Sequence, residues 1–254
     1  MVKLALLSVI ICVNTLISVG YSQSSDYIFQ QGFEHYESGN FIKAKSLYEK
    51  AIEIDRKNKT PDYLKYYNLA VVYKGLDELE ISIGYYDTCI YLNPDMYQAY
   101  DGRAGSFMLL GLFDKAMIDF NNAINISNQS LSWYNRGLLH FWQGNYENAI
   151  LDFEYSYNQQ NKNSETLFLS LAKCYAKTGN IEKAIFYYEK AIKTMEHEDG
   201  EAIEALIWIE ANKSNLDKTK LCKLLNQLIE INNRLNDYLF SETIKEYSSI
   251  CQDD

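Results

Sequence analysis

Small, apolar and turn-forming residues recur in a fixed register along most of the chain. Each copy has a turn residue, an aromatic or aliphatic residue two positions later, and a small residue three positions after that. The copies lie about 34 residues apart, and only the first step is longer. They read SGNFIKA (38–44), LDELEIS (76–82), LGLFDKA (110–116), QGNYENA (143–149) and TGNIEKA (178–184). Such a period predicts an array of similar structural units.

Within each copy the apolar residues follow the period of a helix. In the third copy, Ala116, Phe120 and Ala123 are three or four residues apart, so they share one helix face. We expect a first helix that ends near the turn and a second helix that follows it. Small residues allow the two helices to approach closely, and aromatic residues fill the space beside them. The small residues of the first helices are Gly32, Ala70, Ala104, Gly137 and Ala172, and the aromatic residues of the second helices are Tyr48, Tyr86, Phe120, Phe153 and Tyr188.

This register resembles that of the tetratricopeptide repeat family. The fourth copy matches it best, with Trp133, Gly137, Gly144, Ala149 and Phe153. The resemblance implies an all-α fold, namely a right-handed superhelical α-solenoid of antiparallel helix pairs. It also implies one continuous core and no separate second domain. The five expected repeats cover about 25–58, 63–96, 97–129, 130–163 and 165–198.

The pattern decays after the fifth repeat. Residues 199–254 are expected to form a degenerate sixth repeat and a C-terminal capping helix, with helices near 201–212, 216–232 and 238–250. A terminal unit that differs from the others is what such an array needs, because its outer face must be more polar.

The N-terminal segment has the plan of a secretory signal peptide. Lys3 precedes an apolar stretch that runs from Leu4 to about Val19, and small residues follow at Gly20 and Ser22. This pattern predicts a signal peptide over 1–22 and an exported protein, periplasmic or extracellular. The alternative is an uncleaved anchor, which would be the protein's contact with a membrane.

The net charge and the cysteine spacing limit which partners, disulfides and metal sites the sequence favours. The formal net charge is −10 and no basic stripe is present, which argues against nucleic acid. Cys89 takes a repeat position that usually holds alanine, so it is expected to be a small core residue. Cys222 and Cys251 lie on the final helices and can meet, but spacing alone leaves their pairing open. The cysteines include no CxxC pair, which argues against a zinc site.

The histidines do not point to catalysis. His35 and His140 share a repeat position that holds Tyr73, Phe107 and Tyr175 elsewhere, so it is a packing position. His197 lies in MEHEDG, which is typical of a solvated charge run. The chain has no GxSxG, HExxH or phosphate-binding glycine loop. We therefore predict no enzyme activity, no cofactor and no metal site.

The remaining candidate site is a surface. In the resembled family, one set of first-helix positions lines a concave groove, and here that set is rich in aromatic and aliphatic residues. Such residues are typical of interaction sites. The predicted partner-binding groove comprises Phe29, Phe33, Tyr36, Tyr67, Val71, Lys74, Met108, Tyr134, Leu138, Phe141, Trp142 and Lys173. The alternative is that some of these residues pack against neighbouring first helices.

The pattern therefore favours a non-enzymatic scaffold that binds a protein or peptide partner in the cell envelope. The chaperone-tail clamp known in part of the family is not matched, because Asn68 alone agrees with it and Phe29, Phe33, Gln98 and Gly102 do not. One alternative is a glycan-binding or glycan-processing envelope protein that uses groove aromatics and carboxylates. Another is a component of a membrane assembly held by an uncleaved N-terminus.

Overall fold

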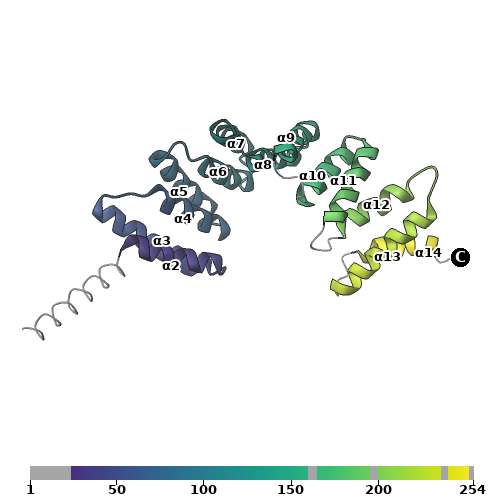
Figure 1. Cartoon of the computed structure of the whole chain (residues 1–254), viewed down its shortest axis with the longest axis horizontal. Coiled ribbons are helices and arrows are strands. Elements are labelled where there is room, and N and C mark those ends of the chain that lie inside the picture. The colour runs from purple at the N-terminus through teal and green to yellow at the C-terminus, as the bar shows by residue number, and fades with distance from the viewer. Residues whose placement is uncertain (1–23, 160–164, 195–199, 236–239, 252–254) are drawn as a thin grey trace, which may run out of the picture. The chain divides into compact units, whose positions relative to one another are not determined.

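The computed structural model describes residues 24–159, 165–194, 200–235 and 240–251. The expected signal peptide and His197 lie outside these ranges. Within them the chain forms thirteen α-helices and no strand (Figure 1). The all-α fold class predicted from the sequence is confirmed. No helix of the described ranges combines the length and apolar character that crossing a membrane requires.

The helices follow one another as pairs. They are α2 (Ser25–Glu37), α3 (Phe41–Asn58), α4 (Tyr63–Gly75), α5 (Leu79–Leu92), α6 (Tyr97–Leu109), α7 (Phe113–Ser127), α8 (Ser130–Trp142), α9 (Tyr146–Gln159), α10 (Glu165–Lys177), α11 (Ile181–Thr194), α12 (Glu201–Ala211), α13 (Lys218–Leu235) and α14 (Ser241–Cys251). Each even-numbered helix from α2 to α12 is the first helix of a repeat, and the next helix is the second.

The turn inside each of the first five repeats uses a left-handed residue. Gly39, Gly111, Gly144 and Gly179 have φ between 72° and 79°, and Asp77 takes the same position with a φ of 63°. Glycine adopts this conformation without steric cost, and aspartate is among the few other residues that tolerate it. The conformation reverses the chain, so the second helix folds back on the first.

Close packing within and between pairs explains the small residues. A Cβ atom added at Gly137 of α8 would lie 2.6 Å from the Phe153 ring of α9. One added at Gly102 of α6 would lie 2.4 Å from the Tyr86 ring of α5. Phe153 and Tyr86 are both buried, so neither ring can move aside without opening the core. Glycine at these two positions is therefore a packing requirement.

The described residues fall into two compact units, unit 1 up to Asn128 and unit 2 from Gln129 onward. Unit 1 has a buried cluster that includes Tyr48, Leu69 and Tyr86. Unit 2 has another, which includes Phe153 and Leu225. The single continuous core expected from the sequence stays a prediction. Repeats of this kind contact mainly their neighbours, so their core is built from local clusters that need not merge into one body.

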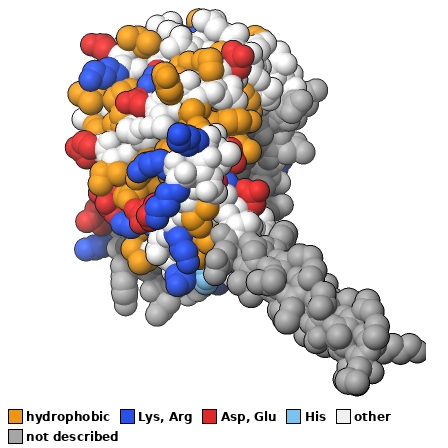
Figure 2. Space-filling view, turned by 90° about the vertical axis from the view of Figure 1, so that its left-hand side faces the viewer, with side chains coloured by type: hydrophobic (Ala, Val, Ile, Leu, Met, Phe, Trp, Pro, Cys, Tyr) orange, Lys and Arg blue, Asp and Glu red, His pale blue; other side chains and the backbone are white. Residues whose placement is uncertain are grey.

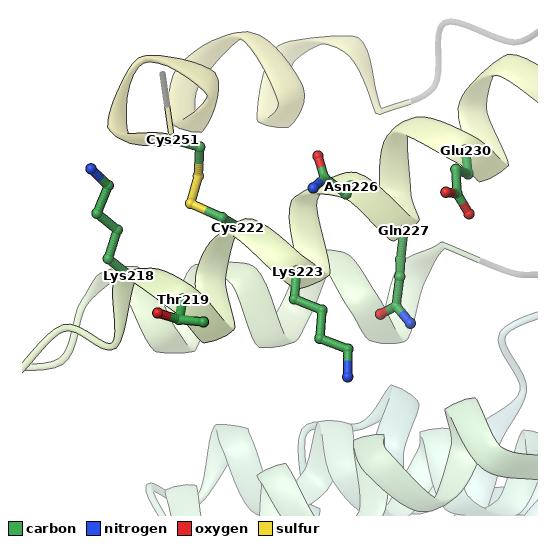
Figure 3. A pocket seen from close by; sticks show the side chains of 8 residues that line it. All are labelled: Lys218, Thr219, Cys222, Lys223, Asn226, Gln227, Glu230 and Cys251. Atoms are coloured by element: carbon green, nitrogen blue, oxygen red, sulfur yellow. A yellow bond between two sulfur atoms is a disulfide. The ribbon is translucent and has the colours of Figure 1, made fainter. Parts of the chain in front are cut away.

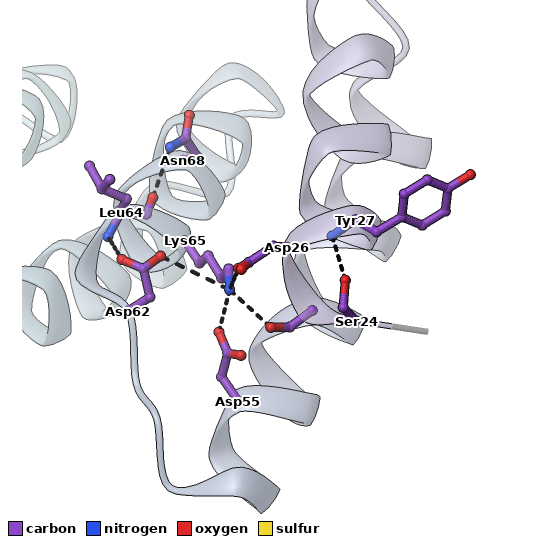
Figure 4. A network of polar contacts seen from close by, with 9 residues as sticks. Ser24, Asp26, Tyr27, Asp55, Asp62, Leu64, Lys65 and Asn68 are labelled. Atoms are coloured by element: carbon purple, nitrogen blue, oxygen red, sulfur yellow. Dashed lines mark hydrogen bonds and ion pairs between the residues drawn. The ribbon is translucent and has the colours of Figure 1, made fainter. Parts of the chain in front are cut away.

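A buried lysine ties three helices of unit 1 together (Figure 4). The Lys65 ammonium on α4 lies 2.7 Å from Asp55 of α3 and 2.6 Å from Asp26 of α2. It also donates a hydrogen bond to Ser25 at 3.1 Å. Lys65 and Asp55 are 3% and 4% exposed, so each charge depends on the other. Burial lowers the pKa of Lys65, but the hydrogen bonds to Asp26 and Asp55 outweigh it and raise the pKa overall.

The cysteines divide into a bonded pair and buried thiols. Cys222 of α13 and Cys251 of α14 form a disulfide with a Cα–Cα distance of 5.6 Å. This bond answers the question that the sequence left open. Cys89 and Cys174 are free and buried, as expected for small core residues. Burial raises the pKa of the Cys89 thiol to about 11 and that of Cys174 to about 12, so both stay protonated.

Candidate partner-binding face

The residues of the predicted groove all lie on first helices. We call the residues on α2, α4 and α6 the first-helix face of unit 1, and those on α8 and α10 the first-helix face of unit 2. The first set is Phe29, Phe33, Tyr36, Tyr67, Val71, Lys74 and Met108, and the second is Tyr134, Leu138, Phe141, Trp142 and Lys173. Each face is described within its own unit.

Several aromatic rings of these faces pack against second helices. In unit 1 the Phe29 ring centre lies 4.9 Å from that of Tyr48, and the Tyr67 ring centre lies 5.9 Å from that of Tyr86. These first-helix rings are half-buried. They therefore contribute to the fold and offer only part of their surface to a partner. These contacts are with second helices, whereas the sequence-based alternative named neighbouring first helices.

Unit 2 repeats this arrangement. The Tyr134 ring centre on α8 lies 5.4 Å from that of Phe153, and the Phe141 ring centre lies 5.5 Å from that of Tyr146. Both partners belong to α9. Replacing Tyr134 or Phe141 would therefore disturb the helix pair as well as the surface.

Two rings of the predicted set remain largely exposed. Phe33 on α2 is 38% exposed, and Trp142 at the end of α8 is 54% exposed. An exposed tryptophan is a common energetic anchor of protein interfaces, because its large ring gains most when water is removed from it. Trp142 is thus the most exposed ring of the predicted set.

The two lysines of the predicted set differ in their surroundings. Lys74 on α4 is half-buried, and burial lowers its pKa while the field of Asp101 opposes the change. A Cβ atom added at Gly105 would lie 3.6 Å from its ammonium, so α6 leaves space for it. Lys173 on α10 instead forms an ion pair of 2.5 Å with Glu201 of α12. Its charge is therefore already used within unit 2.

Two tyrosine hydroxyls lie buried beneath the first-helix face of unit 1. Those of Tyr48 and Tyr86 have no hydrogen-bond partner among the described residues. Burial raises the pKa of Tyr48 to about 12 and raises that of Tyr86 further, so both hydroxyls are neutral. The repeat register predicted their rings as core but carried no signal for the unsatisfied hydroxyls.

The histidine position is a packing position in unit 2, as expected. His140 on α8 keeps 16% of its side chain exposed, and its Nε2 lies 3.8 Å from Asp152 of α9. No group of three or more histidine, cysteine, aspartate or glutamate side chains gathers as a metal site within the described ranges. His140 is therefore placed for packing between helices.

Sequence reasoning did not single out the apolar residues exposed on second helices. Tyr91 of α5 is 85% exposed, Leu151 of α9 is 64% exposed, and Phe186 of α11 is 51% exposed. Figure 2 shows one face of the molecule, on which hydrophobic side chains alternate with charged ones and do not merge into one patch. Single exposed apolar residues of this kind are normal on soluble domains.

Comparison with known proteins agrees with this repeat architecture. Family models described as tetratricopeptide repeats match residues 25–58 and 66–96, and another matches 166–197. The chain is 29% identical over 187 residues to the TPR repeat-containing protein MJ1428 of Methanocaldococcus jannaschii, covering 69% of this chain and 32% of that protein. It is 32% identical over 101 residues to human tetratricopeptide repeat protein 6, covering 40% and 19%. The chain thus spans about a third or less of these relatives' length.

Solved structures share the fold. PilF of Pseudomonas aeruginosa aligns with a TM-score of 0.73 at 20% identity, over 91% of this chain and 99% of that one. YrrB, a TPR protein with an unusual peptide-binding site, aligns with a TM-score of 0.60 at 20% identity, over 78% and 97%. These structures show an α-solenoid fold, and the family models match tetratricopeptide repeats at three segments of the chain.

Proposed function

We propose that this protein is a non-enzymatic scaffold that holds a segment of another protein against its first helices, in the cell envelope. Tetratricopeptide repeats typically bind proteins or peptides, which supports a binding role over catalysis. The observation that carries the proposal is Trp142, an exposed ring on the first-helix face of unit 2. The half-buried rings around it would extend the contact through their edges.

Two features support export. The N-terminal pattern is that of a signal peptide, and Cys222 and Cys251 form a disulfide between the last two helices. Disulfides persist in oxidising compartments such as the periplasm and are rare in the cytosol. N-terminal sequencing of the mature protein from fractionated cells tests this part, and a mature chain that begins at Met1 in the cytosol contradicts it.

The binding role is tested by replacing Trp142 alone. Trp142→Gln should keep the far-UV circular dichroism and melting midpoint of the wild type, because more than half of the residue is exposed. Affinity capture from the native envelope should then lose a partner that the wild type retains. Loss of a binding anchor costs about 2 kcal/mol or more, a factor of about 30 in affinity.

The matched control is Leu151→Gln, which removes a similarly exposed apolar side chain from the second helix α9. It should leave capture unchanged. If Trp142→Gln and Leu151→Gln retain the same partners as the wild type, the first-helix face of unit 2 is not the binding surface.

A further inference from the structure

A hollow of about 420 Å³ lies outside the predicted groove, between α11, α12 and α13 of unit 2. Its apolar part is formed by Ile192 of α11, Leu206 of α12 and Leu224 of α13. Leu206 and Leu224 are 3% and 8% exposed, and Ile192 is half-buried. The hollow is therefore large enough for one large side chain, and its apolar lining would gain from being covered.

Three lysines surround this apolar lining. Lys220 is partly neutralised, because its ammonium lies 3.3 Å from Glu189 and 3.9 Å from Glu210. Lys193 and Lys223 line the same hollow, are exposed, and form no ion pair with any residue that the structure describes. These two lysines, without an ion pair among the described residues, lie beside an apolar hollow in a chain whose net charge is −10.

The hollow continues along α13 into a second one. Lys223 and Gln227 line both, and the second hollow, of about 540 Å³, is also bordered by Thr219, Asn226 and the Cys222–Cys251 disulfide. Figure 3 shows Lys223 and Gln227 extending from α13 on the side opposite the disulfide. Because Lys223 and Gln227 line both hollows, their ammonium and amide groups can bind polar groups of an extended chain that covers both.

We propose that the α11–α13 hollow binds a peptide segment of a partner protein in which one large apolar side chain is flanked by aspartate or glutamate. The apolar side chain covers Ile192, Leu206 and Leu224, and the flanking carboxylates pair with Lys193 and Lys223. The site uses second helices and α12, so it is separate from the first-helix faces of the proposed function. Charge complementarity selects an acidic segment, since a basic one would be repelled by Lys193 and Lys223.

A peptide fits the hollow better than a nucleic acid does. A polyanion needs a continuous basic stripe, and here Glu189 and Glu230 line the same hollows as the lysines. A phosphate backbone would also leave the apolar lining in contact with water. The combination of one apolar hollow and a small number of cations therefore matches a short acidic motif.

The test measures fluorescence anisotropy of labelled nine-residue peptides on the full mature chain. The probes carry a central Leu, Phe or Trp between two acidic residues on each side. At least one should bind the wild type, and Lys193→Glu with Lys223→Glu should weaken it about tenfold or more, equal to about 1.4 kcal/mol. Peptides with Asn and Gln in place of the acids, or Ser in place of the central residue, should bind about tenfold more weakly.

The control reverses the same number of charges elsewhere. Lys43 and Lys50 of α3 are exposed and have no ion pair with a described residue, so Lys43→Glu with Lys50→Glu should leave binding unchanged. Trp142→Gln should also leave it unchanged, which separates this site from the proposed function.

Several outcomes overturn the proposal. The first is that no probe binds at up to about 1 mM. The second is that the Lys43 and Lys50 control weakens binding as much as reversal of Lys193 and Lys223 does. The third is that the serine-centred peptide binds as tightly as the peptides with an apolar centre. A single-stranded oligonucleotide that competes as well as the peptide indicates a nucleic-acid site instead. A loss of self-association on reversal of Lys193 and Lys223 identifies the occupant as a second copy of this chain.

Discussion

At the scale of single residues, His140 shows how a polar side chain is used for packing. Its repeat position holds Phe107 and Tyr175 in other copies, and its Nδ1 is buried without a hydrogen-bond partner among the described residues. Burial lowers the pKa of His140, Asp152 opposes the change, and Arg136 adds to it. The fold thus favours the neutral imidazole.

This environment predicts that acid destabilises unit 2 through His140. Because the pKa is below 6.5 in the folded state, the unfolded state binds the proton more readily. The stabilisation that comes from neutral His140 is present above pH 6.5 and is lost as the pH falls towards the folded pKa. His140→Phe should remove this dependence, so urea unfolding between about pH 7 and 5 should show the wild type losing stability relative to the variant. Parallel pH profiles would show that His140 does not titrate differently on folding.

The sequence predicted residue roles where the repeat register constrains them, and missed roles set by pairs of residues. His140 was recognised as packing because aromatics fill its position in other copies. The pair of Arg103 and Asp119 was not predicted, although its bonds are 2.7 and 2.8 Å long. The equivalent residues of the second repeat are Leu69 and Tyr85, so the repeat register alone does not specify an ion pair at these positions.

At the scale of elements, the expected helices lie close to the observed ones because turn residues and apolar period agree. The disulfide between α13 and α14 was left open, since wide cysteine spacing does not specify pairing. In the structure it joins residues 29 apart, and so holds the last helix on the preceding one. The C-terminal cap therefore depends on a covalent bond as well as on its buried Tyr247 and Phe240.

We expect Cys222→Ser with Cys251→Ser to destabilise this end of unit 2. Closing a loop of this length removes entropy from the unfolded chain and stabilises the fold by about 3–4 kcal/mol. Urea unfolding of the oxidised wild type and of the double variant measures the difference. Reductant should lower the stability of the wild type and leave the variant unchanged. Cys89→Ser and Cys174→Ser are unsuitable controls because both thiols are buried. A variant that unfolds like the oxidised wild type would show that the disulfide does not stabilise α14.

At the scale of the whole molecule, the described residues fall into two compact units, one up to Asn128 and one from Gln129. The repeat register could not predict this division, because it describes each copy by the same positions. What differs is how strongly neighbouring copies pack, and this depends on the particular side chains at each interface. Nearest-neighbour stabilisation of this kind allows parts of an array to unfold separately.

The tryptophans make that separation measurable. Trp133, Trp142 and Trp208 all belong to unit 2, so tryptophan fluorescence reports that unit, whereas far-UV circular dichroism reports the helices of both. Lys65→Met leaves Asp55 of unit 1 buried without its cation, which should cost about 3–5 kcal/mol. The part of the dichroism transition that comes from unit 1 should move to a lower urea concentration. The fluorescence transition of unit 2 should keep its midpoint.

The partly exposed ion pair of Lys45 and Glu78 supplies the control for this prediction, and the cysteine variant supplies the converse test. Lys45→Met removes a partly exposed pair of 3.0 Å, so it should cost at most about 1 kcal/mol. Cys222→Ser with Cys251→Ser acts in unit 2 and should move the fluorescence curve. If Lys65→Met shifts fluorescence and dichroism by the same amount, the two units unfold together. A single cooperative transition would then describe the whole chain.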